Sequence, residues 1–226
     1  MAFIVLEGLD GAGKSTQIRQ LQQWLDEQGK MVEYLHFPRF ETPLYGDLIA
    51  RFLRGELGAV DEVNPYLTAL IYAGDRKEAA PLIRRWLNEQ KVVIVDRYVS
   101  SNIAYQCAKL QGDAEKNALR TWIRELEYDM NGIPEPDMTL FLDVPFAFTE
   151  KSLAKNRQGD DRDYLQGKTD IHEDSLDLQQ AVRQVYLAEA ALDPAFRVVD
   201  CSDESGEMLK PEETFARIRE CLAPVL

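Results

Sequence analysis

Short apolar runs alternate with longer helical patterns along this chain of 226 residues. The runs cover residues 2–7, 31–36, 91–96, 138–143 and 196–200, and apolar side chains recur at helical spacing between them. Two stretches, 92–95 and 138–142, are almost continuously apolar, which is typical of strands covered on both faces of a sheet. The pattern predicts a single α/β domain over residues 1–226, with helices on both faces of a parallel sheet.

A phosphate-binding loop directly follows the first apolar run. Residues 8–15 read GLDGAGKS and match G-x-x-x-x-G-K-[ST] in full, with a helical pattern starting at the end of the motif. In this motif backbone N–H groups and a lysine hold the phosphates, a hydroxyl ligates Mg²⁺, and the helix adds the positive end of its dipole. We therefore expect an ATP-type nucleotide to bind here, at Gly8, Leu9, Asp10, Gly11, Ala12, Gly13, Lys14, Ser15 and Thr16.

Charge and composition limit the class of partner. The chain has 39 acidic and 26 basic residues and a net charge of -13, whereas binders of nucleic acid or anionic membranes present a basic face. The three cysteines lack C-x-x-C spacing, so neither a disulfide framework nor a zinc site is expected. No signal-peptide pattern follows Met1, and no stretch approaches the roughly 18 apolar residues of a membrane helix. We expect a cytoplasmic protein that acts on small anionic ligands.

Charged residues follow the second and third apolar runs, at the edge of the sheet where ligands of parallel α/β proteins bind. Asp96 ends a run of apolar residues, which is the layout of the Mg²⁺-organising element of P-loop enzymes. Arg39 and Arg97 lie close to it in the predicted fold, and each guanidinium needs an anionic partner. For Arg97 a second phosphate and a salt bridge to a neighbouring carboxylate both remain open. Two arginines facing a second anion favour a kinase over a nucleotide hydrolase.

The chemistry of such a kinase needs little from titrating side chains. The chain lacks an N-K-x-D motif, which weakens a GTPase-switch interpretation, and its only histidines are His36 and His172. A phosphate acceptor needs no general base, because its second pKa is about 6 and it is mostly dianionic at pH 7. Direct in-line transfer then depends on positioning and charge neutralisation.

A densely charged segment, about residues 157–174, contains glycines and lacks core periodicity. We interpret it as a mobile surface flap. Such a charge run is typical of a solvated loop, and in a phosphate-binding protein it is equally typical of a lid that closes over the site.

The motifs in residues 8–16, 37–39, 72–76 and 96–105 resemble, in order and spacing, those of the thymidylate kinase family of P-loop nucleoside monophosphate kinases. The resemblance runs from the first predicted strand to the last predicted helix. It implies transfer of a phosphoryl group from ATP, with Mg²⁺, to dTMP, which gives dTDP for dTTP biosynthesis. It also implies a five-stranded parallel sheet and a homodimer.

The resemblance assigns substrate-binding roles as well. It implies that Arg39 and Arg97 contact the acceptor 5′-phosphate, that Tyr72 stacks on thymine, and that Arg76 and Asn102 contact the polar edge of the base. Asp10 would lie near the 3′-hydroxyl, Tyr105 would leave no room for a 2′-hydroxyl, and Ser101 belongs to the same segment. The pattern alone leaves alternatives open, because Tyr72 is also typical of a helix core and Asn102 of a helix cap.

The chain departs from some members of the family at the phosphate loop, which has no arginine before Lys14. Arg157 and Arg162 resemble lid arginines that supply this charge, and we expect Arg162 to reach the γ-phosphate and Arg157 to lie nearer the adenine. Glu173 is a candidate for the metal or the sugar, and His172 stands where members often have an aromatic residue. The expected catalytic residues are Lys14, Arg39, Arg97, Arg162 and Asp10. The expected metal-binding residues are Ser15, Asp96 and Glu173.

Two other functions remain open at this point. A kinase for a different deoxynucleoside monophosphate would share the sheet, the phosphate loop and the flap. A P-loop regulatory module would lack an acceptor site, and it would leave Arg39, Arg76 and Arg97 without a common role.

Overall fold

The computed structural model describes all residues except 61, 155–159, 169 and 173–174. Its strands form one parallel sheet of five in the order β2-β3-β1-β4-β5. The predicted sheet is confirmed, and each apolar run matches a strand to within one residue: β1 (Ala2–Gly8), β2 (Val32–His36), β3 (Val92–Asp96), β4 (Met138–Asp143) and β5 (Phe196–Asp200).

Position in the sheet explains why some strands are continuously apolar and others are not. All residues of β1 and β3 are buried, because these inner strands carry helices on both faces. The edge strands β2 and β5 are only partly covered, and within β5 only Phe196 and Val199 are buried. The polar residues within β2 and β5 therefore reflect their place at the edges.

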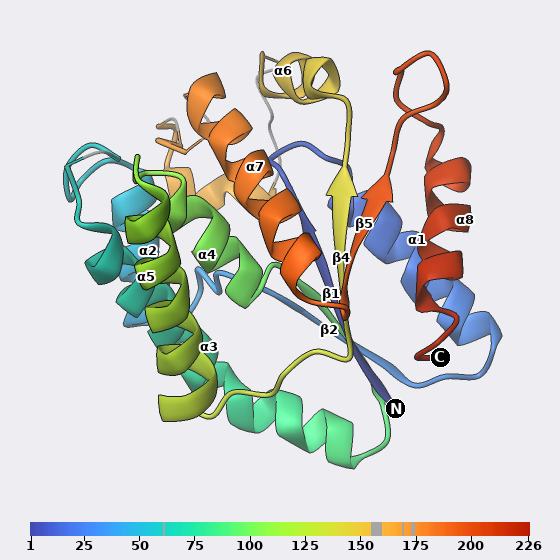
Figure 1. The fold of residues 1–226 in the computed structure, drawn as a ribbon. Coiled ribbons are helices and arrows are strands. Elements are labelled where there is room, and N and C mark those ends of the chain that lie inside the picture. The colour runs from blue at the N-terminus through green and yellow to red at the C-terminus, as the bar shows by residue number, and fades with distance from the viewer. Residues whose placement is uncertain (61, 155–159, 169, 173–174) are drawn as a thin grey trace.

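Two helical layers enclose the sheet (Figure 1). On one face, α1 (Lys14–Glu27) and α8 (Pro211–Leu222) pack against Ile4 and Leu6 of β1. On the other face, α3 (Pro65–Asn88), α4 (Val99–Cys107) and α5 (Asp113–Arg124) pack against Phe3 and Val5, and α7 (Leu176–Leu192) covers Phe141 and Phe196. Successive residues of β1 thus serve opposite cores, as the two-residue period of a strand requires.

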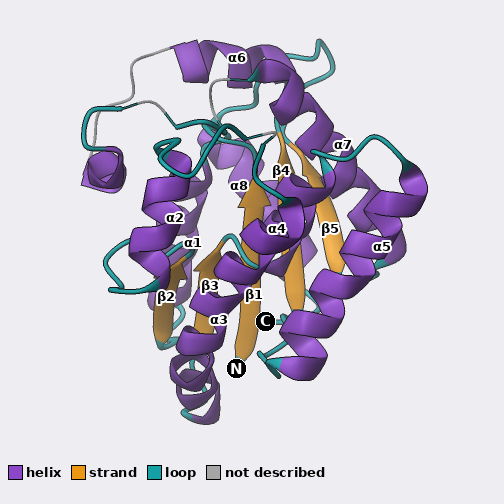
Figure 2. Cartoon of the chain, turned by 90° about the vertical axis from the view of Figure 1, so that its left-hand side faces the viewer, coloured by secondary structure: helices purple, strands orange, loops and turns teal. Residues whose placement is uncertain are grey.

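The remaining elements are short. They are α2 (Tyr45–Leu53), the π-helix η1 (Glu125–Met130) that continues α5, α6 (Phe146–Ala154) and the 3₁₀-helix η2 (Asp160–Leu165). Figure 2 shows α6 beyond the carboxyl ends of the strands. Within the described part of the chain, none of the helices combines the length and apolarity needed to span a bilayer.

Candidate active site

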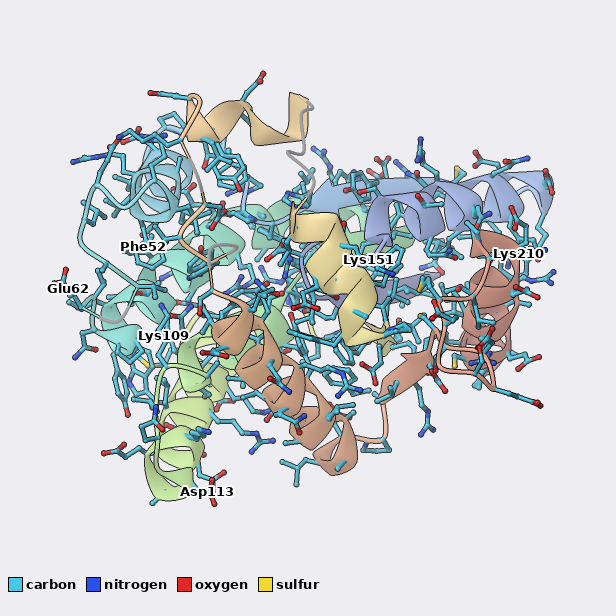
Figure 3. All side chains as sticks on the ribbon, turned by 90° about the horizontal axis from the view of Figure 1, so that it is seen from above. Phe52, Glu62, Lys109, Asp113, Lys151 and Lys210 are labelled. Atoms are coloured by element: carbon cyan, nitrogen blue, oxygen red, sulfur yellow. The ribbon has the colours of Figure 1, made fainter. Side chains whose placement is uncertain are left out.

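A cavity of 1060 Å³ opens at the carboxyl edge of the sheet. It is lined by the phosphate loop, the ends of β2 and β3, and residues of α2, α3, α4 and the segment after α6. Figure 3 looks onto this edge from above, with Lys151 of α6 near the middle of the view. Residues far apart in the sequence therefore meet here, as expected for a parallel sheet.

The phosphate loop joins β1 to α1, and two of its glycines carry backbone angles that other residues rarely adopt. Gly11 has a φ of 77° and Gly13, the residue before α1, a φ of 83°. A Cβ atom at Gly11 would collide with the Ser152 side chain. Lys14 Nζ donates to the carbonyl oxygens of Gly8 and Leu9, each at 3.3 Å. The amine therefore lies over its own loop, where phosphates bind in this motif.

Burial lowers the pKa of Lys14, and the neighbouring Arg97 guanidinium lowers it further, while Asp96, Asp10 and Glu7 oppose the shift. The shift is thus mainly a cost of removing the amine from water. A bound polyanion would offset that cost and favour the protonated amine.

Asp96 ends β3 at the floor of the cavity and is 4% exposed. Its Oδ1 atom is buried and has no hydrogen-bond partner, which is uncommon for a carboxylate and fits a cation ligand. Ser15 lines the same cavity. Within the part of the chain that is described, no three acidic, histidine or cysteine side chains are grouped to hold a metal ion. A Mg²⁺ ion would then take most of its ligands from phosphates and water, as it usually does.

Asp10 is the centre of a hydrogen-bonding network inside the loop. Arg97 Nη2 donates to its Oδ1 at 2.6 Å, while Tyr105 Oη and Gln179 Nε2 donate to its Oδ2 at 2.7 and 3.1 Å. Burial raises the pKa of Asp10, but Arg97, Lys14 and the two hydrogen-bond donors together hold it below its ordinary value. The salt-bridge partner of Arg97 is thus Asp10.

Arg97 has a strained backbone, with a φ of 64° in a residue other than glycine. Such a conformation costs about 1–3 kcal/mol and persists where the surroundings hold it. Its N–H donates to the Leu6 carbonyl at 3.0 Å, Nη1 donates to Ser101 Oγ at 3.3 Å, and the guanidinium lies 5.3 Å from the centre of the Tyr105 ring. These contacts aim a cation into the cavity at a sharp turn of the chain.

Arg39 lies in the loop after β2, which contains a cis peptide bond between Phe37 and Pro38. Asp75 of α3 accepts from the Arg39 backbone N–H at 2.9 Å and from Nε at 2.8 Å. Asp75 is 1% exposed, so this pair locks the loop onto α3. No pattern in the sequence marks Asp75 as functional, although it stands beside Arg76.

Arg76 and Asn102, placed on different helices, share one partner. Glu127 of η1 accepts from Arg76 Nε and Nη2 at 2.5 and 2.6 Å, and from Asn102 Nδ2 at 2.9 Å. Both Arg76 and Asn102 line the cavity. The helix-cap alternative for Asn102 is wrong, because the residue lies inside α4 and the N-cap is Tyr98. Glu127 was missed by sequence analysis, since it stands among several charged residues of one helix.

Tyr72 also lines the cavity, on the same helix as Arg76. The alternative of a core aromatic beside Leu67, Leu70 and Ile71 holds only in part. The two leucines are 60% and 48% exposed, but Tyr72 and Ile71 pack against a buried apolar cluster that includes Phe52. Burial raises the pKa of Tyr72, and the nearby Asp170 carboxylate raises it further, so the phenol stays neutral. Its ring is available as a flat apolar wall.

Ser101 is held by the carboxylate of Glu7 in β1, a residue that was not predicted from the sequence. Ser101 Oγ donates to Glu7 Oε2 at 2.6 Å, and the backbone N–H groups of Ser101 and Tyr98 donate to Oε1 at 3.1 and 2.9 Å. Tyr186 Oη donates to Oε2 at 2.9 Å. Glu7 fixes the start of α4 and with it the residues behind Arg97. A single acid in an otherwise apolar strand was the available signal.

Part of the predicted flap folds against α2. The Tyr164 ring stacks on Phe40 with centroids 3.7 Å apart, and Arg54 Nη1 donates to the Tyr164 carbonyl at 2.6 Å. Arg157 and Glu173 lie outside the described residues, and so does the side chain of Arg162, whose backbone belongs to η2. The expected roles of these three residues stay predictions.

His172 forms an aromatic contact at the place where an aromatic residue was expected. Its ring stacks on Tyr105 at 4.9 Å and meets Phe52 edge-on at 5.5 Å. Burial lowers its pKa to about 3, helped by the Lys109 and Arg97 charges and opposed by Asp10. Phe52 and Lys109 lie on the same side of the molecule in Figure 3, with Lys109 Nζ 4.9 Å from the ring centre. A neutral imidazole thus covers Tyr105.

The phosphate loop, the buried aspartate at the end of β3 and a second set of arginines line one cavity over a parallel sheet. This combination defines a P-loop nucleotide kinase, because a hydrolase has no use for the second set. The family model described as thymidylate kinase matches residues 6–213. The chain belongs to the thymidylate kinase family.

Individual relatives agree with this assignment. Thymidylate kinase from Mycobacterium tuberculosis is 35% identical over 189 residues, which cover 84% of this chain and 86% of that protein. Probable thymidylate kinase from Thermococcus kodakarensis is 32% identical over 212 residues, with coverage of 89% and 90%. A solved structure of thymidylate kinase from Candida albicans matches with a TM-score of 0.71 at 26% identity, over 99% of this chain and 91% of that one.

Proposed function

We propose that the protein transfers the γ-phosphoryl group of ATP to dTMP, which yields ADP and dTDP and serves dTTP biosynthesis. Family membership supports the activity. The observation that carries it is that one cavity is lined both by a triphosphate loop and by a separate set of donors for a second nucleotide: Arg76, Arg97 and Asn102.

In the proposed reaction an oxygen of the dTMP phosphate attacks the γ-phosphorus, and the bond from that phosphorus to the β,γ-bridging oxygen breaks. The electron pair stays on ADP, and no proton transfer is needed while the acceptor is a dianion. Lys14 and the loop N–H groups would hold the ATP phosphates. Asp96 and Ser15 would hold Mg²⁺, which when bound neutralises charge on the β- and γ-phosphates.

Arg97 and Arg39 would bind the phosphate of the acceptor, dTMP. Arg97 keeps donors beyond the one that binds Asp10, and its fixed backbone directs them to where two phosphates would meet. Arg39 is held by Asp75 and would close the other side of the acceptor phosphate. With both arginines preset by carboxylates, little rotational freedom is lost when dTMP binds.

Other residues that line the cavity would bind the sugar and the base of dTMP. The Tyr105 hydroxyl is tied to Asp10 at 2.7 Å, and His172 covers the ring, so Tyr105 cannot swing away to admit a 2′-hydroxyl. Tyr72 would stack on the base. Arg76 and Asn102 would offer a donor and an acceptor to its edge.

Closure would come from the lid at about residues 157–174. The packing of Tyr164 against the buried cluster Ile49, Phe52 and Leu53 supports a lid that rests on α2. Arg162 would reach the γ-phosphate, Arg157 would lie nearer the adenine, and Glu173 would assist the metal or the sugar. We also propose that the enzyme works as a homodimer.

Steady-state phosphorylation by ATP of dTMP, dUMP, dCMP, dGMP and dAMP tests the function. We expect the highest kcat/KM for dTMP and a requirement for Mg²⁺. Preference for a purine nucleotide would refute the assignment of Arg76 and Asn102, and ATP hydrolysis without transfer to any monophosphate would refute the kinase.

A further inference from the structure

The partners of Asn102 determine which of its two amide atoms faces the base. Nδ2 donates to Glu127 Oε1 at 2.9 Å and to the Ala69 carbonyl at 3.1 Å. Both partners are acceptors, so the NH₂ group must point at them. Oδ1 is left without a hydrogen-bond partner, in a residue that is 3% exposed and lines the cavity. The site therefore offers a bare acceptor that needs a ligand N–H.

Glu127 fixes the neighbouring arginine by the same means. It accepts two hydrogen bonds from Arg76, through Nε and Nη2, and both side chains are almost fully buried at 2% and 0% exposure. A bidentate pair of this kind sets the plane of the guanidinium. Arg76 can present only its remaining N–H groups to the cavity, and these groups only donate.

The position of Glu127 depends on a local change of helix type. The segment Glu125–Met130 is a π-helix that continues α5, with the Ile133 N–H bonded to the Glu127 carbonyl at 3.2 Å. A π-helical turn holds more residues than an α-helical turn and redirects the side chains that follow it; such turns are frequent at functional sites. Leu126 and Glu127 are the buried members of this one.

We infer that Glu127 is a positioning residue that sets base specificity. It orients Asn102 so that the amide carbonyl faces the base, and it orients Arg76 so that the remaining N–H groups face the base. This inference rests on the proposed kinase function. An acceptor beside a donor matches the imide N–H and the adjacent carbonyl of thymine or uracil. Cytosine presents a lone pair and an amino group at the same two positions, so both contacts are mismatched. Buried polar groups left without partners make such discrimination large.

The test compares kcat/KM for dTMP, dUMP and dCMP in the wild type, Glu127→Gln and Glu127→Asp. The amide introduced by Glu127→Gln can donate as well as accept, so Asn102 loses its charged acceptor and can turn over. We expect the dTMP to dCMP ratio to fall about tenfold or more, the effect of one hydrogen bond to a charged group. The ratio of dTMP to dUMP should stay constant, because the two share the imide edge. Glu127→Asp keeps an acceptor-only carboxylate and should retain the preference even if activity falls.

Glu189→Gln is the matched control, since Glu189 is a buried carboxylate paired with Arg120 and lines a different cavity. Glu189→Gln should leave both the dTMP to dCMP ratio and the dTMP to dUMP ratio unchanged. A purely structural Glu127 would lower kcat/KM equally for dTMP and dCMP, and that result would overturn the inference. Should Glu127→Gln not fold, Asn102→Leu removes the acceptor directly; an unchanged dTMP to dCMP ratio in it would also overturn the inference. A wild type without activity on dTMP would refute the kinase itself.

Discussion

Replacing Arg97 by alanine removes the cation that the proposed mechanism places between the two phosphates. The side chain is 13% exposed and pairs with Asp10 at 2.6 Å. A charge-assisted contact to the acceptor phosphate contributes about 1.5–3 kcal/mol, which corresponds to a loss of about 10- to 150-fold in kcat/KM. Asn102→Ala removes a neutral contact to the base worth about 1 kcal/mol and should cost about fivefold.

Arg97→Ala should also be less stable than the wild type, because Asp10 then keeps only two hydrogen-bond donors, the neutral side chains of Tyr105 and Gln179. The Asp10 side chain is 20% exposed, so we expect a loss at the lower end of the range of about 1–3 kcal/mol that an unpaired buried polar group costs in the free energy of unfolding. Urea unfolding measures this loss, and steady-state kinetics with dTMP varied at saturating ATP measures kcat/KM. Arg120→Ala is the control, because it breaks an arginine–carboxylate pair that lies outside the proposed site. Equal losses in Arg97→Ala and Asn102→Ala, or less than about a threefold loss in Arg97→Ala, would refute the reasoning.

Three further predictions concern the lid, the buried histidine and the acceptor site. Arg162→Ala should lower kcat by about 10³-fold or more with little change in the KM for ATP; an unchanged kcat would remove Arg162 from the mechanism. His172 has a folded-state pKa of about 3, below its unfolded value, so the unfolded chain protonates first and stability should fall as pH drops from about 6.5 toward 3. His172→Phe keeps an aromatic ring on Tyr105 and should remove about 1.4 kcal/mol per pH unit of that dependence in urea unfolding, whereas identical pH profiles would contradict the shift. dTMP alone at about 100 times its Kd should stabilise the fold by about 2.7 kcal/mol in thermal unfolding, and no stabilisation would argue for a regulatory module without an acceptor site.

The sheet and the phosphate loop could be predicted because their signals are local. Apolar runs define buried strands, and the glycines and the lysine of residues 8–15 lie together in the sequence. Asp96 could be placed because it ends such a run, and the parallel sheet then brings it to the loop.

The carboxylates that hold the functional side chains were not predicted. Glu7, Asp75 and Glu127 contact partners between 25 and 179 positions away, so spacing gives no clue to them. Glu127 depends on a π-helical turn that a standard helical period does not reveal. The Arg97–Asp10 pair was foreseen only as a general possibility, because the carboxylate that a guanidinium meets depends on the tertiary packing.

The central claim is that two nucleotides occupy one cavity at the same time, with their phosphates end to end. Isothermal titration of dTMP into the protein saturated with Mg²⁺ and a non-hydrolysable ATP analogue tests it most directly. We predict one dTMP bound per chain, with an affinity equal to or higher than that without the analogue. Loss of dTMP binding in the presence of the analogue would show that the two compete for one site, and it would contradict the account.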